Sequence, residues 1–164
     1  MTKKNVLILI SIMCFLSISY TIFMQYAYSL NPCPLCIAER LLIGFIGIIT
    51  LVYALHNPQN FLMRIYGMMI TLIAGFIIKI SIQHLWLINL PINDKPSSCG
   101  APLEILFKQL PLNNFLQYIL NGDAECGINN WQILGISSPM MVILLCCLII
   151  ILALYITFSQ NKIK

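Results

Sequence analysis

The sequence predicts an all-α membrane protein, a four-transmembrane-helix bundle with one long loop on one side of the membrane. Hydrophobic residues make up 60% of the 164 residues, and the mean hydropathy is +0.91. Only nine basic and five acidic residues are present, whereas about a quarter of the residues in a soluble domain are charged. The composition therefore indicates a single integral membrane domain over residues 1–164, and four long apolar runs supply its helices.

The first predicted helix covers about residues 6–28, a run of 23 residues without a charge. About 20 apolar residues suffice to cross the hydrocarbon core of a bilayer. A cleaved signal peptide is the alternative for this segment, but the apolar region of a signal peptide contains only about 7–15 residues. We therefore expect the segment to remain in the protein as an uncleaved first span.

A tight turn over about residues 29–36 separates the first span from the second, and it contains two prolines. Proline cannot continue the first helix, whereas Pro34 suits the first turn of the next one. The second predicted helix covers about residues 35–55 and carries Glu39 and Arg40 near its start. We interpret Glu39 as a charge that complements the dipole at the helix start rather than as a base.

Two further apolar runs predict the third helix at about residues 65–90 and the fourth at about residues 139–158. Between these helices, about residues 91–138 form the one long segment predicted outside the membrane. Two parts of this loop, residues 103–110 and 113–120, mix apolar and polar residues. Such segments suit short amphipathic helices that lie on the membrane surface.

The distribution of charge predicts the orientation of the four spans. The termini and the turn between the second and third helices carry five basic residues and no acid, namely Lys3, Lys4, Arg64, Lys162 and Lys164. The long loop on the other side carries two lysines and four acids. Because basic residues accumulate in cytoplasmic segments, we expect both termini in the cytoplasm. The sequence has no basic patch interleaved with aromatic residues, so we predict no nucleic-acid partner.

Seven cysteines are present, and three of them lie inside apolar runs: Cys14, Cys146 and Cys147. We interpret these three as packing residues, because a buried free cysteine behaves as a small hydrophobic residue. The other four are Cys33, Cys36, Cys99 and Cys126. All four fall on the predicted non-cytoplasmic side, where disulfides persist. We therefore expect disulfide chemistry there and no metal site.

Cys33 and Cys36 form a C-x-x-C motif at the predicted start of the second helix. The unpaired N–H groups and the dipole at a helix start favour a thiolate. Arg40 lies one turn after Cys36 on the same helical face and adds a positive charge. Because the thiolate is the reactive form of cysteine, the motif predicts a redox-active dithiol at the membrane surface. An inert disulfide that staples the turn is the alternative.

Cys99 and Cys126 lie 27 residues apart in the long loop, a spacing that permits a disulfide. Such a bridge stabilises a fold by roughly 3–4 kcal/mol in the chain-entropy model, and this structural role is the alternative to a redox role. Two disulfides that face one compartment can also pass electrons by thiol–disulfide exchange. The sequence has no haem, flavin or metal-cluster motif, so a lipid-soluble quinone beside Cys36 and Arg40 is the expected electron acceptor.

The segment Pro32–Ile37, Pro-Cys-Pro-Leu-Cys-Ile, followed by Glu39-Arg40, closely resembles the DsbB family of quinone-dependent disulfide-forming membrane proteins. The resemblance extends over nearly the whole chain, including the four spans, the two loop cysteines and Gly122-Asp123 before the second of them. It implies a multi-pass protein of the bacterial inner membrane, with both cysteine pairs and the long loop in the periplasm.

The resemblance also implies roles for the cysteines. The redox-active disulfides would be Cys33–Cys36 and Cys99–Cys126, and the cofactor would be ubiquinone or menaquinone. A soluble thioredoxin-like partner of the DsbA type would form a mixed disulfide with Cys99. Cys126 would then exchange with Cys33, which leaves Cys36 to interact with quinone beside Arg40.

Two polar residues, Lys79 and His84, interrupt the third predicted helix. The family counterpart of His84 lies near the quinone, which makes His84 a candidate for quinone binding. The alternative is a histidine that is hydrogen-bonded at the membrane interface. A charge inside a membrane is often functional. We nevertheless interpret Lys79 as contacting Gln83 or a carbonyl, or as extending its ammonium group toward the membrane surface.

Two other functions remain as alternatives to the quinone-linked reoxidation of a DsbA-like protein. The vitamin K epoxide reductase type is another four-helix family linked to quinone. That family places its membrane-facing C-x-x-C late in the bundle, whereas the motif here opens the second helix. A non-enzymatic membrane assembly protein would use the two disulfides only for stability, and it would tolerate Arg40→Ala.

Overall fold

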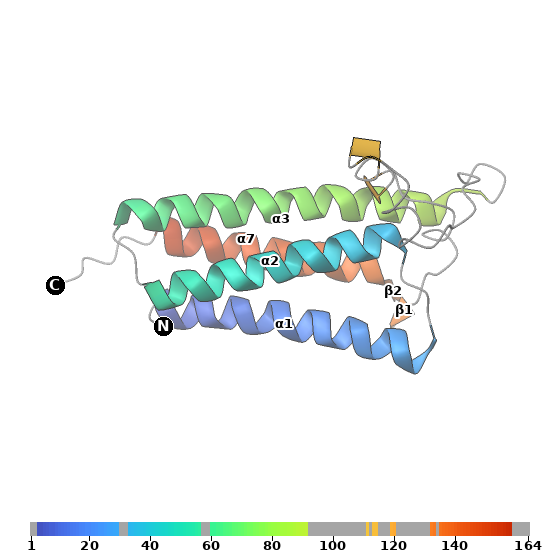
Figure 1. Cartoon of the computed structure of the whole chain (residues 1–164), viewed down its shortest axis with the longest axis horizontal. Helices are drawn as coiled ribbons and strands as arrows, with labels where there is room; N and C mark the ends of the chain where they lie inside the picture. The colour runs from blue at the N-terminus through green and yellow to red at the C-terminus, as the bar shows by residue number, and fades with distance from the viewer. Residues whose placement is uncertain are drawn as a thin grey trace.

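The computed structural model describes residues 3–29, 33–56, 60–91, 111, 113–114, 119–120, 132–133 and 135–158. Four long helices lie side by side in this part of the chain (Figure 1): α1 (Lys3–Ala27), α2 (Pro34–His56), α3 (Asn60–Asn89) and α7 (Ser138–Phe158). Each contains a stretch of 21 to 26 residues that is long and apolar enough to cross a membrane. The predicted fold class, an all-α four-helix membrane bundle, is therefore confirmed.

The helix bounds differ from the prediction mainly at two starts. α1 begins at Lys3, three residues before the predicted start, and α3 begins at Asn60, five residues before it. The prediction placed each start where the apolar run begins. A helix satisfies its own backbone hydrogen bonds, however, so it continues through polar residues that lie beyond the hydrocarbon core. The other helix ends lie within one residue of the prediction.

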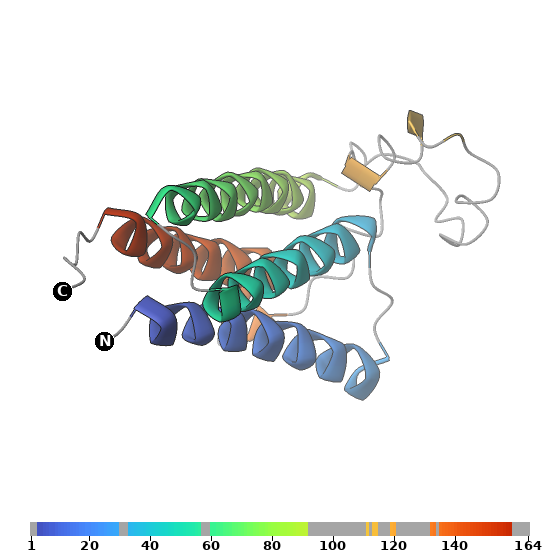
Figure 2. The ribbon, with the colours of Figure 1, turned by 60° about the vertical axis from the view of Figure 1, so that its left-hand side comes forward.

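Consecutive helices run in opposite directions and pack against their neighbours in the chain (Figures 1 and 2). α2 packs against both α1 and α3, and α7 packs mainly against α3. The start of α1, the end of α2, the start of α3 and the end of α7 therefore share one end of the bundle. The start of α2, with its C-x-x-C motif, lies at the other end, beside the end of α3 and the start of α7.

The core of the bundle is small and apolar. Its fully buried members, all 0% exposed, are Ile10, Cys14, Ile46, Ala74, Ile77, Cys146 and Ile149. α1 and α2 approach closely at Gly47, whose carbonyl accepts a 3.0 Å hydrogen bond from the Ser11 hydroxyl. Small residues at such a contact let two membrane helices pack backbone to backbone.

The prediction that Cys14, Cys146 and Cys147 all pack in the core holds for the first two only. Cys14 and Cys146 are buried, whereas Cys147 is exposed on the outside of the bundle. Successive residues in a helix point about 100° apart, and here Cys146 faces the core while Cys147 faces outward. Lys79 is also exposed on the outer surface of α3, which agrees with an extended side chain and not with a buried contact.

The long loop is described only in part. The strand β1 (Gln132–Ile133) pairs with β2 (Ile136–Ser137) in an antiparallel hairpin directly before α7, which the sequence analysis did not predict. Gly135 in its turn has φ 80°, a backbone conformation that suits glycine. On α3, the Gln83 side chain donates a 2.8 Å hydrogen bond to the carbonyl of Leu120. Most of the two predicted amphipathic helices lies outside the described residues.

Candidate active site

Cys33 lies directly before α2 and caps the start of this helix. Its carbonyl accepts the N–H of Ile37 at 3.1 Å, and its sulfur accepts the N–H of Cys36 at 3.3 Å. Pro34 follows at the first helical position, where its missing N–H leaves no donor unsatisfied. The Cys33 sulfur therefore takes the place that a serine or aspartate oxygen often takes at a helix start.

The two sulfur atoms of the motif lie close together, with the Cys33 thiol donating to the Cys36 sulfur over 2.9 Å. Cys33 is only 2% exposed and packs against Ile80 and Leu87 of α3. Cys36 is less buried. The two sulfurs therefore have different surroundings, although they are only one helical turn apart.

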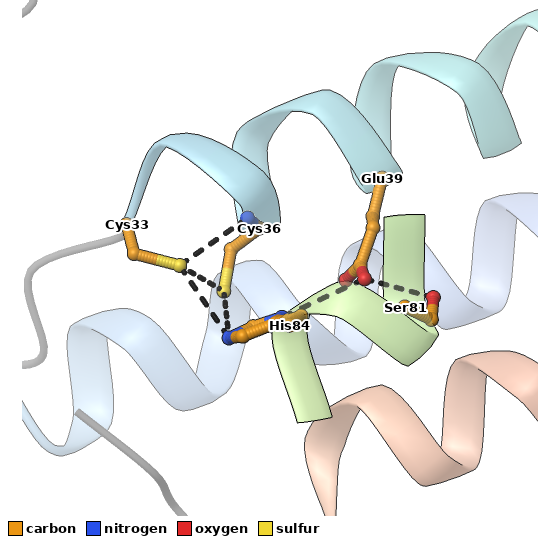
Figure 3. Close-up of polar contacts among 5 residues, drawn as sticks. All are labelled: Cys33, Cys36, Glu39, Ser81 and His84. Carbon is orange, nitrogen blue, oxygen red and sulfur yellow. Dashed lines mark hydrogen bonds and ion pairs between the residues drawn. The ribbon is translucent and has the colours of Figure 1, made fainter. Parts of the chain in front are cut away.

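His84 of α3 lies against both sulfurs inside the bundle (Figure 3). Its Nε2 atom is 3.7 Å from the Cys33 sulfur and 4.0 Å from the Cys36 sulfur, and the residue is 2% exposed. The antiparallel packing of α2 and α3 brings these residues together from positions about 50 residues apart in the sequence. The structure places His84 beside the two sulfurs of the motif.

Glu39 stands behind the imidazole on the side away from the sulfurs (Figure 3). Its Oε1 atom lies 3.6 Å from His84 Nδ1 and accepts a 2.8 Å hydrogen bond from the Ser81 hydroxyl. Glu39 is 4% exposed, so this carboxylate is buried against α3. The sequence contains a signal for the contact between Glu39 and His84. Residues three apart share a helical face, so Glu39 lies on the same face of α2 as Cys36, and Ser81 lies on the same face of α3 as His84.

Arg40 points away from this group toward α1. Its Nη1 donates a 2.6 Å hydrogen bond to the side-chain oxygen of Gln25, and its Nη2 donates a 3.4 Å hydrogen bond to the carbonyl of Thr21. A guanidinium has five N–H donors in a rigid plane, so these two contacts hold its orientation. Gln25 and Thr21 were not predicted as partners of Arg40. Neither their residue types nor their distance from Arg40 in the sequence indicates which residues of another helix an arginine contacts.

A pocket of about 240 Å³ lies between α1, α2 and α7. Cys36, Glu39 and Arg40 line it, together with apolar side chains such as Ile18, Met141 and Leu145. His84 is not among the described residues that line this pocket. Cys36 therefore lies between His84 of α3 and a pocket that is bordered by both the Arg40 guanidinium and the Glu39 carboxylate.

The described part of the site contains four of the six predicted site residues. Cys33, Cys36 and His84 come together, and Arg40 lies on the pocket beside Cys36. Cys99 and Cys126 lie outside the described residues. The arrangement brings together two cysteine sulfurs, an imidazole that can accept a proton, and a cation beside a pocket.

Comparisons with known proteins agree on one family. The family model for disulfide bond formation protein DsbB matches residues 3–156. The disulfide bond formation protein B of Acinetobacter baylyi is 36% identical over 138 residues, covering 84% of this chain and 78% of the relative. The protein of the same name from Xylella fastidiosa is 33% identical over 148 residues, covering 90% and 85% of the two chains.

A third relative, the disulfide bond formation protein B of Chromobacterium violaceum, is 34% identical over 141 residues, covering 86% of this chain and 84% of the relative. No solved structure matches the chain. The resemblance to the DsbB family, first seen in the C-x-x-C segment, is thus confirmed over most of the chain. The chain belongs to the DsbB family of disulfide bond formation proteins.

Proposed function

We propose that this chain is a quinone-dependent protein-dithiol oxidase of the bacterial inner membrane. It reoxidises a periplasmic thioredoxin-like protein of the DsbA type and transfers the electrons to membrane quinone. The position of Cys36 carries the proposal, because its sulfur contacts Cys33 and the residue also lines the pocket that Arg40 borders. The names of the relatives, disulfide bond formation protein B, support the thiol-oxidase part of the proposal.

Two electrons pass through two disulfides in the proposed reaction. The partner's dithiol reduces the Cys99–Cys126 disulfide, with Cys99 forming the mixed disulfide, and the partner leaves with a disulfide of its own. Cys126 then attacks Cys33, so the loop disulfide re-forms while Cys33–Cys36 becomes a dithiol. Because Cys33 is only 2% exposed, this attack requires a local movement at the start of α2.

The pocket beside Cys36 suits a quinone head group. Its mostly apolar wall matches the ring, and Arg40 brings N–H donors to the place where an oxygen would gain negative charge. When bound there, quinone supplies an acceptor for two electrons and two protons. Gln25 and Thr21 hold the guanidinium, so its charge is in place before the reaction. Both ubiquinone and menaquinone satisfy these requirements.

Re-forming the Cys33–Cys36 disulfide releases two thiol protons as well as two electrons. His84 Nε2 is close enough to both sulfurs to accept a proton from either of them. The imidazolium that results faces the Glu39 carboxylate across 3.6 Å, which stabilises its charge in a buried place. We therefore assign proton transfer to His84 and the positioning of its ring to Glu39.

The proposed orientation places both termini in the cytoplasm and both cysteine pairs in the periplasm. The five basic residues near the two ends of the chain and at the start of α3 support it. Alkaline phosphatase, which is active only outside the cytoplasm, tests the orientation. Fusions within the 91–138 loop are expected to be active and fusions after residue 158 to be inactive. The reverse pattern would contradict the orientation.

The two alternative functions, a vitamin K epoxide reductase type and a non-enzymatic assembly protein, explain fewer of these observations than the proposed oxidase does. The match to the DsbB model over residues 3–156, and the place of the motif at the start of α2, favour this family over the vitamin K epoxide reductase type. A purely structural disulfide explains neither the buried His84–Glu39 pair beside the thiols nor Arg40 on the neighbouring pocket.

Quinone reduction by the purified chain tests the proposal. The protein in detergent is mixed with a reduced DsbA-type donor and with a water-soluble analogue of ubiquinone or of menaquinone. We expect one quinone to be consumed for each disulfide formed in the donor. Cys36→Ser should abolish the reaction, while Cys147→Ser, on the outer surface, should retain it. Turnover by Cys36→Ser, or none by the wild type with either quinone, would contradict the proposal.

A further inference from the structure

Three atoms that bind metals well converge in the α2–α3 interface. The sulfurs of Cys33 and Cys36 and an imidazole nitrogen of His84 all lie within 4.8 Å of one another. This donor set, two thiolates and one imidazole, occurs in zinc sites that keep one coordination position open. We propose that the dithiol form of this site binds one zinc(II) ion through Cys33, Cys36 and His84, and that the ion blocks the oxidation of the dithiol.

The distances between the donor atoms are close to those that zinc requires. Tetrahedral zinc, with bonds of about 2.3 Å to sulfur and about 2.0–2.1 Å to nitrogen, separates sulfur from nitrogen by about 3.5 Å and the two sulfurs by about 3.8 Å. The nitrogen lies 3.7 Å and 4.0 Å from the two sulfurs. The sulfurs, now 2.9 Å apart, must separate by about 1 Å. A rotation of the less buried Cys36 side chain is enough for this change.

The far side of the imidazole is already arranged as in many metal sites. A histidine that binds a metal through one nitrogen usually donates its other N–H to a carboxylate, which holds the ring in place. Glu39 Oε1 lies 3.6 Å from His84 Nδ1, and Ser81 holds the same oxygen with a 2.8 Å hydrogen bond. His84 Nδ1 is buried without a hydrogen bond in the described structure. A small movement of the Glu39 carboxylate toward Nδ1 gives it one.

The charge balance also favours a divalent ion. Zinc(II) replaces the two thiol protons of Cys33 and Cys36, so the net charge of the buried site does not change. No electron is transferred, and two protons leave to solvent. Sulfur and imidazole donors select zinc over magnesium and calcium, which prefer oxygen ligands. Because Cys36 borders the pocket, a water molecule can reach the fourth position on the metal.

Binding of this kind depends on the redox state of the motif. In the disulfide form the sulfurs are no longer thiolates, so the site loses two of its three ligands. Zinc therefore holds the chain in the reduced state until the ion leaves. The inference requires two thiols and an imidazole but no electron acceptor. Zinc binding can therefore be absent while the oxidase function is present, and zinc can bind even if the chain does not reduce quinone.

Cadmium titration of the full-length chain tests the site. Cys99, Cys126 and Cys147 are replaced with serine, so that the motif is the only pair of thiols outside the core. After reduction with a phosphine and its removal under argon, cadmium is added while the ultraviolet thiolate-to-cadmium absorption is followed. Zinc affinity is then measured by competition with a chromogenic chelator. His56→Gln, at the opposite end of α2, is the matched control for His84→Gln.

We expect one metal ion per reduced chain and none per oxidised chain. Glu39→Gln should weaken zinc binding about 10–100-fold, as the loss of a partner of a metal ligand does. His84→Gln, which removes a ligand, should weaken it at least as much, and His56→Gln should have no effect. X-ray absorption of the wild-type zinc complex, which requires no variant, should show two sulfur ligands and one histidine nitrogen.

Equal binding by the oxidised chain, no stoichiometric binding by the reduced chain, or unchanged affinity in His84→Gln would overturn the proposal. An absorption spectrum without a histidine nitrogen would also overturn it. Quinone reduction by the metal-free wild type reports separately on the oxidase function. If that function holds, stoichiometric zinc added to the reduced chain should stop turnover, and a chelator should restore it.

Discussion

Glu39 of α2 and His84 of α3 face each other inside the bundle, with 3.6 Å between the carboxylate Oε1 and the imidazole Nδ1. Neither residue is more than 4% exposed. A buried carboxylate is costly unless it is paired and hydrogen-bonded, and Ser81 together with His84 meets that need. The pair also fixes which imidazole nitrogen faces the two thiols. It therefore connects the packing of α2 on α3 with the chemistry of the C-x-x-C motif.

Replacing Glu39 with glutamine should slow turnover. The amide can still accept the hydrogen bond from Ser81, but it removes the charge that stabilises an imidazolium at His84. A hydrogen bond to a charged group contributes about 1.5–3 kcal/mol, so we expect the turnover number with quinone to fall about 10–100-fold. Ser81→Ala, which keeps the carboxylate, is the control and should have the smaller effect. Equal turnover in Glu39→Gln and wild type would refute the role of this carboxylate.

Replacing Arg40 with alanine should weaken the use of quinone. The guanidinium lines the pocket beside Cys36, so its loss should raise the KM for quinone about 10-fold or more, while the Cys33–Cys36 disulfide still forms. Arg40→Lys should recover only part of the affinity, because an ammonium cannot reproduce the planar contacts to Gln25 and Thr21. Arg64→Ala, in the first turns of α3, is the control. An unchanged KM over a full quinone titration would contradict this role.

Replacing Cys126 with serine should trap the partner. Without Cys126, the mixed disulfide between Cys99 and the DsbA-type donor cannot resolve within the loop. We expect a band on a non-reducing gel that disappears on reduction and contains both proteins. Cys147→Ser should give no such band. If the trapped complex formed only in Cys99→Ser, the roles of the two loop cysteines would be reversed.

Two glycines of α3 should respond in opposite ways to alanine. A Cβ at Gly67 would collide with the Thr157 hydroxyl of α7, whereas a Cβ at Gly75 would meet no atom within 4 Å. Overpacking typically costs about 1–3 kcal/mol, so Gly67→Ala should lower the melting temperature in detergent. Gly75→Ala should leave it unchanged or raise it, since alanine favours a helix by up to about 1 kcal/mol over glycine.

A second substitution checks the cause of the Gly67→Ala effect. Adding Thr157→Ala removes the colliding hydroxyl and should recover much of the lost stability. Equal melting temperatures for Gly67→Ala and Gly75→Ala would show that α3 and α7 do not pack as described.

Local sequence features were enough to predict the bundle. Four apolar runs determine the spans because each is long enough to cross the hydrocarbon core. Pro34 marks the start of α2 because proline, which lacks an N–H, suits the first turn of a helix. The β1–β2 hairpin was missed, because two strands of two residues each leave no periodic pattern. Cys147 was misplaced because an apolar run does not show which residues face the core.

The sequence by itself determined the four-helix membrane class, the C-x-x-C motif at a helix start and the family to which the chain belongs. These depend on hydropathy and on residues that are neighbours in the chain. Only the tertiary structure brought Glu39 and His84 together behind the thiols and turned Arg40 toward Gln25 on α1. Contacts between helices depend on the rotation of each helix about its own axis. That rotation is set by the packing of whole faces, so the partners of a buried polar residue become known only from the assembled bundle.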